Sequence, residues 1–146
     1  MIGDIAEDFT LKDQNGNLFR LYDNLFQKIL LIFYPKDDTP VCTRQLSDYS
    51  INKEIFDNLG VTLVGINTAS VESHKSFAGS CKVDFPVLSD SRKEVSRKYR
   101  ALNLFGINKR KLVLIGIDKR ILFEKAVLSS TYLSSRRLKE IFEQFS

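Results

Sequence analysis

Two short apolar segments joined by a helical segment constrain the fold of this chain most. Residues 29–34 are apolar and partly β-branched, and they stop at Pro35, which is typical of a buried strand. Residues 40–59 predict a helix with Gly60 as its C-terminal stop, and residues 61–66 predict a second buried strand. A β-α-β unit of this kind has parallel strands and a right-handed crossover. The chain is therefore expected to contain a sheet with parallel strands covered by helices.

The rest of the chain predicts further strands and helices around that unit. Asn15-Gly16 lies between apolar flanks and tolerates the positive φ angles of a tight turn, so an N-terminal β-hairpin is expected. The other expected elements are a helix at 70–81, an extended piece at 85–88, a helix at 92–99, a hairpin of strands at 111–117 and 121–127, and an amphipathic C-terminal helix carrying Leu138, Ile141, Phe142 and Phe145. This order predicts an α/β fold with a mixed central sheet flanked by helices. No repeat or linker divides the chain, so residues 1–146 are expected to form a single domain.

Composition and charge exclude several classes of function. Apolar residues make up 43% of the chain and charged residues 27%, which is typical of a globular protein. The net charge of +4 comes from scattered basic residues, so a nucleic-acid partner is not expected. No apolar run approaches the roughly 20 residues that span a bilayer. Residues 1–9 carry three acidic and no basic side chains, so no secretory signal is expected either.

The two cysteines, Cys42 and Cys81, are too few to hold a small fold together by disulfides. We therefore expect a reducing, cytoplasmic setting in which the thiols take part in chemistry or are simply buried.

Cys42 occupies a position that favours the thiolate form. Thr39 followed by Pro40 is typical of an N-cap and a first helical residue, so Cys42 falls in the first turn of the helix. Free backbone N–H groups and the positive end of the helix dipole stabilise an anion there. Since the thiolate is the nucleophilic form of cysteine, Cys42 is a candidate nucleophile.

The neighbours of Cys42 exclude several kinds of thiol chemistry. A phosphatase of the Cys-x5-Arg type needs arginine where Asp48 stands, and a Cys-x-x-Cys pair needs cysteine at Thr39 or Gln45. Two distant cysteines and one histidine, His74, do not make a tetrahedral zinc site. A Cys–His hydrolase with His74 as its base stays open, but the polar sequence around His74 predicts an exposed helical residue.

Thr39 and Pro35 are expected to complete the site around the sulfur. An N-cap hydroxyl accepts from the backbone N–H of the third helical residue, which here is Cys42. Such a hydroxyl both donates and accepts, so it can hold a peroxide oxygen beside the sulfur. Pro35 ends the preceding strand and can shield the thiolate from water.

The string Pro35-x-x-x-Thr39-x-x-Cys42 resembles the active-site motif of the peroxiredoxins. The longer run at 34–43 is similar to the bacterioferritin comigratory protein, or peroxiredoxin Q, branch of that family. Matching segments recur along nearly the whole chain, at residues 3–9, 73–77, 85–90 and 110–115.

The resemblance implies a fold, an activity and a set of site residues. The fold is thioredoxin-like, and the activity is reduction of hydrogen peroxide and organic hydroperoxides through a sulfenic acid on Cys42. Arg110 matches the family arginine that stabilises the thiolate and the transition state, with Thr39 and Pro35 beside it. No metal, haem or flavin cofactor is implied. Thioredoxin or another thiol is the expected reductant, and a monomer is the expected state.

Departures from the family pattern concern how Cys42 is restored. Many relatives carry a resolving cysteine at the position of Ser47, so that route is closed. Cys81 lies in the helix where a second subgroup has its resolving cysteine, although that cysteine aligns nearer Ala78. Cys81 is therefore either a resolving cysteine, which requires local unwinding of two helices to meet disulfide geometry, or a small packed residue. Gln45 replaces a family glutamate that pairs with the arginine, which keeps a hydrogen bond and removes a charge.

Two other classes of function are alternatives to the peroxidase. In one, the chain is a non-enzymatic thiol redox sensor or a thioredoxin-fold binding module, and oxidation of Cys42 signals to a partner. In the other, it is a basic nucleic-acid binder whose affinity falls with salt.

Overall fold

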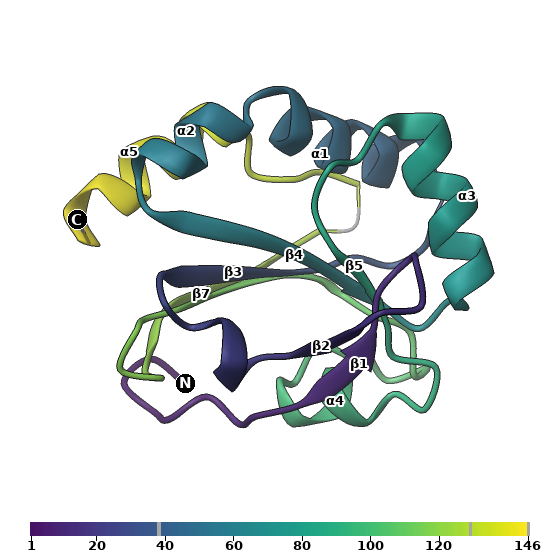
Figure 1. Cartoon of the computed structure of the whole chain (residues 1–146), viewed down its shortest axis with the longest axis horizontal. Coiled ribbons are helices and arrows are strands. Elements are labelled where there is room, and N and C mark those ends of the chain that lie inside the picture. Colours follow the sequence, from purple (N-terminus) through teal and green to yellow (C-terminus); the bar gives the residue numbers. More distant parts are fainter. Residues whose placement is uncertain (38, 129, 146) are drawn as a thin grey trace.

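The structure is a computed structural model that describes residues 1–37, 39–128 and 130–145. Within these residues, seven strands form one mixed sheet in the order β2-β1-β5-β4-β3-β6-β7 (Figure 1). The strands are β1 (Thr10–Lys12), β2 (Leu18–Arg20), β3 (Lys28–Phe33), β4 (Val61–Asn67), β5 (Val87–Ser89), β6 (Arg110–Ile115) and β7 (Ile121–Val127). The parallel pairs β3–β4 and β4–β5 form the centre, and antiparallel pairs complete both sides.

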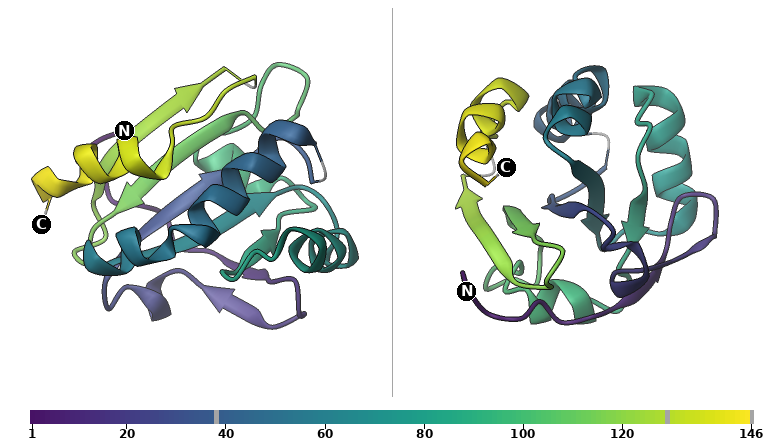
Figure 2. Two further views of the ribbon diagram at one scale, coloured as in Figure 1. Left: turned by 90° about the horizontal axis from the view of Figure 1, so that it is seen from above. Right: turned by 60° about the vertical axis from the view of Figure 1, so that its left-hand side comes forward.

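Helices cover both faces of this sheet. They are α1 (Pro40–Ile51), α2 (Lys53–Asn58), α3 (Val71–Cys81), α4 (Glu94–Lys98) and α5 (Ser135–Phe142). In Figure 2, α1, α2, α3 and α5 lie side by side on one face, whereas α4 lies on the other. Among the described residues, no helix is long and apolar enough to cross a membrane.

The predicted β-α-β unit is confirmed. β3 and β4 pair in parallel over their whole length, from Lys28 opposite Val61 to Phe33 opposite Ile66. β6 pairs with the other edge of β3 in the antiparallel sense, which brings Arg110 to the edge of the sheet where β3 ends. This edge also holds the start of α1, so the two segments that carry the candidate site residues meet there.

The single helix predicted at 40–59 is wrong, because the chain breaks between α1 and α2 at Asn52. The backbone of Asn52 has φ −103° and ψ 26°, and its side-chain amide donates to the backbone oxygen and the carboxylate of Asp48 at 3.0 and 2.8 Å. A short amide side chain that bonds its own backbone competes with helical hydrogen bonding. Gly60 follows α2 with φ +68° and provides the predicted stop.

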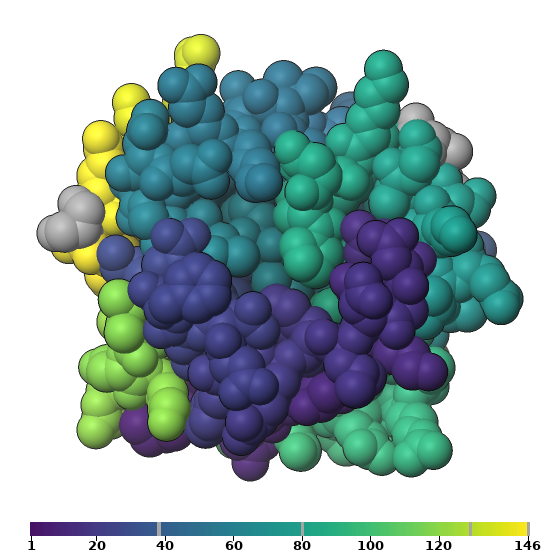
Figure 3. Space-filling view, in the orientation of Figure 1, coloured from purple at the N-terminus to yellow at the C-terminus, as the bar shows by residue number. Residues whose placement is uncertain are grey.

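Both predicted hairpins are confirmed. β1 and β2 are joined by a turn in which Gly16 has φ +79°, and β6 and β7 by one in which Lys119 has φ +71°. The side chain of Gln14 bonds the backbone of Phe85 and Val87, which ties the first hairpin to the segment carrying β5. In the space-filling view, the N-terminal part of the chain (purple) lies against the segment that carries β5 (Figure 3).

The sheet separates two apolar cores. The α1-side core is formed by buried residues that face the row of four helices: Leu30, Ile32, Cys42, Leu46, Tyr49, Phe56, Phe77, Leu138 and Phe142, among others. The α4-side core is formed by residues on the opposite face of the sheet, including Leu31, Phe33, Leu88, Val95 and Tyr99. Consecutive residues of β3 alternate between the two cores, as side chains of a strand must.

Candidate active site

Cys42 lies at the third position of α1, as predicted. Thr39 is the N-cap, with extended backbone angles of φ −87° and ψ 150°, and Pro40 begins the helix. The side chain of Cys42 is fully buried in the α1-side core, and the thiol is free. A sulfur at this position is close to the unpaired N–H groups of the first helical turn, which stabilise negative charge on it.

Arg110 is the side chain that contacts the sulfur. It is the first residue of β6 and is 1% exposed, although it stands between two other basic residues in the sequence. Its Nη2 donates to Cys42 Sγ at 3.1 Å, and its Nη1 donates to Gln45 Oε1 at 2.6 Å. A guanidinium is permanently charged, so it favours the thiolate and also any negative charge that develops beside it.

Gln45 and Tyr49 extend this contact along the inner face of α1. Gln45 Nε2 donates to the Tyr49 hydroxyl at 3.3 Å, and that hydroxyl donates to the Leu133 carbonyl at 2.6 Å. Burial raises the pKa of Tyr49 well above its ordinary value, so the hydroxyl stays neutral. The substitution of glutamine for the family glutamate thus keeps a hydrogen bond to Arg110.

The predicted hydrogen bond from the Cys42 backbone N–H to the Thr39 hydroxyl is wrong. Thr39 makes no side-chain capping bond, and its Oγ1 donates instead to the Lys36 carbonyl at 3.2 Å. A threonine hydroxyl can accept from a backbone N–H or donate to a carbonyl, and here it donates to the carbonyl in the turn before the helix. Pro35 is half-buried in the same loop between β3 and α1.

His74 is not the exposed residue that its neighbours in sequence predict. Its side chain is fully buried, with Nδ1 at 2.8 Å from Asp37 Oδ2 and Nε2 at 3.1 Å from the Leu88 carbonyl. The hydrogen bonds of His74 are thus directed to Asp37 and Leu88. Sequence reasoning also missed Asp37, which is 4% exposed and lies in the loop before Cys42.

A sequence signal for the burial of His74 does exist. Phe77 and Ala78 follow it at i+3 and i+4, and both are buried, so His74 lies on the apolar face of α3.

Cys81 is the last residue of α3 and is half-buried against the α1-side core that contains Cys42. Its carbonyl accepts a long hydrogen bond of 3.5 Å from the Ser47 hydroxyl on α1. Both thiols are free in this structure. The two cysteines come from neighbouring helices that pack on the same core.

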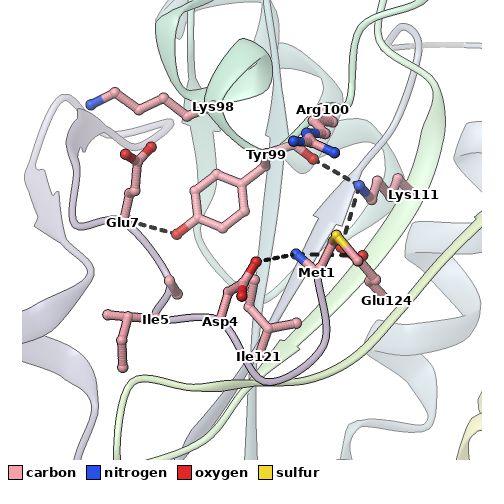
Figure 4. Close-up of a pocket in the computed structure, with 11 residues that line it drawn as sticks. Met1, Asp4, Ile5, Glu7, Lys98, Tyr99, Arg100, Lys111, Ile121 and Glu124 are labelled. Carbon is pink, nitrogen blue, oxygen red and sulfur yellow. Dashed lines mark hydrogen bonds and ion pairs between the residues drawn. The ribbon is translucent and has the colours of Figure 1, made fainter.

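A cavity of about 460 Å³ lies away from Cys42, and none of its lining residues belongs to the cysteine site. Lys111, next to Arg110 in β6, points into it because successive strand residues face opposite ways (Figure 4). The Lys111 ammonium donates to the Tyr99 carbonyl at 2.8 Å and pairs with Glu124 at 3.5 Å. The two neighbouring cations therefore serve different faces of the sheet.

Comparison with known proteins identifies the family. Residues 2–123 match the AhpC/TSA family. The chain is 36% identical over 100 residues to a protein of Helicobacter pylori named peroxiredoxin bcp, an alignment that covers 68% of this chain and 66% of that protein. It is 38% identical over 105 residues to the chloroplastic peroxiredoxin Q of Arabidopsis thaliana, covering 71% of this chain and 49% of that protein. The chain thus spans about two thirds and about half of the length of these relatives.

Among solved structures, peroxidoxin BcpB from Mycobacterium tuberculosis superposes with a TM-score of 0.86 at 27% identity, covering 99% of this chain and 97% of that one. The predicted thioredoxin-like fold and the predicted resemblance of the chain to the bcp and peroxiredoxin Q branch of the peroxiredoxins are both confirmed. The chain belongs to the AhpC/TSA family.

Proposed function

We propose that this protein is a thiol-dependent peroxidase that reduces hydrogen peroxide and organic hydroperoxides at Cys42. The observation that carries the proposal is the 3.1 Å contact between Arg110 Nη2 and Cys42 Sγ at the start of α1. Family membership supports it, since the sequence relatives are named as peroxiredoxins.

The reaction at Cys42 is a nucleophilic attack on one oxygen of the peroxide. The thiolate forms an S–O bond as the O–O bond breaks, and the electron pair of that bond goes to the departing oxygen. This oxygen takes up a proton and leaves as water or an alcohol, so the peroxide is reduced and Cys42 is oxidised to a sulfenic acid. The Arg110 guanidinium and the first-turn N–H groups stabilise the charge that develops on the departing oxygen.

Thr39 and Pro35 are proposed to shape the peroxide side of this site. Both belong to the loop that leads from β3 into α1, and both are half-buried. In the structure the Thr39 hydroxyl donates to the Lys36 carbonyl, so rotation about one side-chain torsion is needed to turn it to a bound peroxide.

Two routes restore Cys42. On the first, Cys81 attacks the sulfenic acid, the Cys42–Cys81 disulfide forms with loss of water, and an external dithiol such as thioredoxin reduces it. On the second, Cys81 stays a packed residue and an external thiol attacks the sulfenic acid directly. The half-buried position of Cys81 on the same core supports the first route, but the helices carrying the two cysteines must open locally for the sulfurs to bond.

Mass spectrometry after one equivalent of hydrogen peroxide, combined with turnover assays, tests the proposal. We expect Cys42→Ser to abolish peroxide consumption and Cys81→Ser to leave the first oxidation of Cys42 intact. A Cys42–Cys81 linked peptide identifies the first route, and a sulfenic acid adduct on Cys42 identifies the second. Consumption that persists in Cys42→Ser contradicts the mechanism. Consumption that stops at one equivalent with excess thioredoxin and other thiols identifies a redox sensor.

The cellular setting, the reductant and the oligomeric state of the enzyme belong to the same proposal. We propose a cytoplasmic monomer that uses thioredoxin or another thiol and binds no nucleic acid. Size-exclusion chromatography with light scattering measures the oligomeric state, and steady-state assays with thioredoxin against glutathione rank the reductants.

A further inference from the structure

A buried polar cluster lies beside the candidate active site and takes no part in the proposed chemistry. Its centre is the Asp37 carboxylate, which is almost fully buried. Asp37 Oδ1 accepts from the Tyr34 hydroxyl at 2.5 Å and, weakly, from the Asn67 amide at 3.5 Å. Asp37 Oδ2 accepts from the Ser73 hydroxyl at 2.6 Å and lies 2.8 Å from His74 Nδ1.

The ring of His74 faces an acceptor at each of its nitrogens. Nδ1 faces the Asp37 carboxylate, and Nε2 faces the Leu88 carbonyl at 3.1 Å. A neutral imidazole carries one N–H donor and one acceptor nitrogen, so it would direct a lone pair at one of these oxygens. The imidazolium donates from both nitrogens and satisfies both oxygens. The cluster also keeps Asp37 ionised, because the hydrogen bonds from His74, Ser73 and Tyr34 outweigh burial and lower its pKa.

Four separate elements meet at this cluster. Tyr34 follows β3, Asn67 ends β4, Leu88 lies in β5, and Ser73 and His74 lie in the first turns of α3. Asp37 itself lies in the segment 34–37 that follows β3, two residues before Thr39, the N-cap of α1. Through Asp37, the segment that carries Pro35 is therefore fixed to the sheet and to α3.

We propose that His74 is an imidazolium, and that its buried ion pair with Asp37 holds the segment 34–37 in place ahead of the start of α1, which carries Cys42. Asp37 and His74 are positioning residues for the peroxide reaction, since they touch this segment and not the reacting sulfur. This inference rests on the proposed peroxidase function. The charge-assisted bond between His74 and Asp37 fixes this segment to α3, which keeps the groups that surround the peroxide in a reactive arrangement.

Nitrogen-15 NMR of the unmodified protein tests the charge of His74 without any substitution. The chain contains one histidine, so the imidazole signals need no assignment. At about pH 7.5 a free histidine is mostly neutral. We expect two protonated ring nitrogens with similar shifts in the folded protein. A widely separated pair, with one nitrogen unprotonated, overturns the assignment of an imidazolium.

Rate constants of Cys42 test the positioning role. In a Cys81→Ser background, Cys42 is the one cysteine left, so its reactions with hydrogen peroxide and with iodoacetamide are both measured directly. Alkylation needs a thiolate, whereas the peroxide reaction also needs the surrounding groups. We expect Asp37→Asn and His74→Asn each to slow the peroxide reaction by about tenfold or more and to change alkylation much less.

Asp90→Asn is the matched control. Asp90 is an equally buried carboxylate, but it accepts from the backbone N–H groups of Val95 and Ser96 at the start of α4. Loss of the Asp90 carboxylate is expected to lower the melting temperature of the protein and to leave the rate constant for oxidation of Cys42 by hydrogen peroxide unchanged. The double variant of Asp37→Asn and His74→Asn should slow the peroxide reaction by a smaller factor than the product of the factors for the two single variants, because neither charge is then left unpaired.

Three outcomes overturn the positioning role. They are an equal fall in the peroxide and alkylation rates, a fall in Asp90→Asn as large as in Asp37→Asn, and a double variant whose losses simply multiply. A failure of the proposed peroxidase function is a different result, since the unmodified protein would then fail to turn over peroxide at all.

Discussion

Arg110 combines burial, charge and contact with sulfur in one side chain. A lysine at this position keeps a positive charge but has a single nitrogen in place of the planar fork, so it cannot reproduce the contact of two separate nitrogens with Cys42 and Gln45. We expect Arg110→Lys to slow the oxidation of Cys42 by hydrogen peroxide by about 100-fold, measured by stopped-flow fluorescence or competition kinetics. The control is Lys109→Met, which removes a neighbouring exposed charge and should have little effect. Equal effects of the two substitutions would assign the role of Arg110 to general electrostatic attraction.

Asp37 gives the stability of the protein a defined acid dependence. Burial acts to raise its pKa, but the bonds from His74, Ser73 and Tyr34 prevail and hold it below the ordinary value of 3.8. Its contribution to stability is therefore present above pH 3.8 and is lost as the pH falls through the lower folded value. We expect the difference in urea midpoint between the wild type and Asp37→Asn to be constant between about pH 4.5 and 5.5, below the range in which an unfolded histidine titrates, and to shrink below 3.8. A difference that grows with acid would contradict the lowered pKa.

At the scale of single residues, the sequence predicted some positions of the site and missed others. Cys42 was found because a cap, a proline and a preceding strand place it at a helix start, and Arg110 because it matches a family position. Asp37 and His74 were missed because they are far apart in sequence and each stands among charged or polar neighbours. The pairing of two polar residues far apart in sequence leaves no periodic pattern in the chain; for His74, only the apolar residues at i+3 and i+4 indicate that it lies on a buried face.

At the scale of elements, prediction succeeded wherever one local signal dominated. Each confirmed hairpin has a turn that accommodates positive φ, and each central strand is a continuous apolar run. The break at Asn52 was missed because residues on both sides of it continue the helical pattern of apolar positions. It depends instead on a local side-chain bond between Asn52 and Asp48, and asparagine is compatible with both a helix and its end.

Gly79 makes the C-terminal end of α3 the weaker part of that helix. It lies two residues before Cys81, and a Cβ added there meets no atom within 4 Å. We expect Gly79→Ala to stabilise the protein by about 0.5–1 kcal/mol. On the two-cysteine route it should also slow formation of the Cys42–Cys81 disulfide severalfold, because that step requires the end of α3 to open. Quenched-flow mass spectrometry separates this step from sulfenic acid formation, which should not change.

Gly60→Ala provides the contrasting substitution for this experiment. Gly60 has equal space around it but φ +68°, so a side chain there strains the backbone and should destabilise by about 1 kcal/mol. It lies at the end of α2, away from Cys81, and should leave the rate of disulfide formation unchanged. A raised melting temperature in Gly79→Ala with an unchanged disulfide rate would mean that α3 stays folded during that step.

At the scale of the whole molecule, the active site is a part of one of the two cores. Cys42 and Tyr49 belong to the α1-side core, and α5 closes that core with Leu138 and Phe142. The backbone N–H and hydroxyl of Ser135 at the start of α5 both bond the Asp48 carboxylate of α1. The C-terminal helix therefore supports the helix that carries Cys42.

Two adjacent leucines of β3 allow the two cores to be compared by identical substitutions. Leu30 and Leu31 are both fully buried, but Leu30 faces the α1-side core with Cys42 and Leu31 faces the α4-side core. Each change to alanine should lower the free energy of unfolding by about 2–5 kcal/mol. If the chain is one cooperative domain, both variants should unfold in a single transition that far-ultraviolet circular dichroism and tyrosine fluorescence report alike.

Activity should nevertheless separate these two variants. Leu30→Ala leaves space in the core that holds Cys42, so the rate constant for oxidation of Cys42 by hydrogen peroxide should fall. Leu31→Ala should keep this rate constant near that of the wild type. Both variants are compared at a temperature where they are folded. Stopped-flow oxidation of Cys42 by hydrogen peroxide provides the measurement. Equal rates in the two variants would mean that the start of α1 is held by its own loop and by Arg110 rather than by the core beneath it. Two separate unfolding transitions would mean that the sheet joins two independently stable layers.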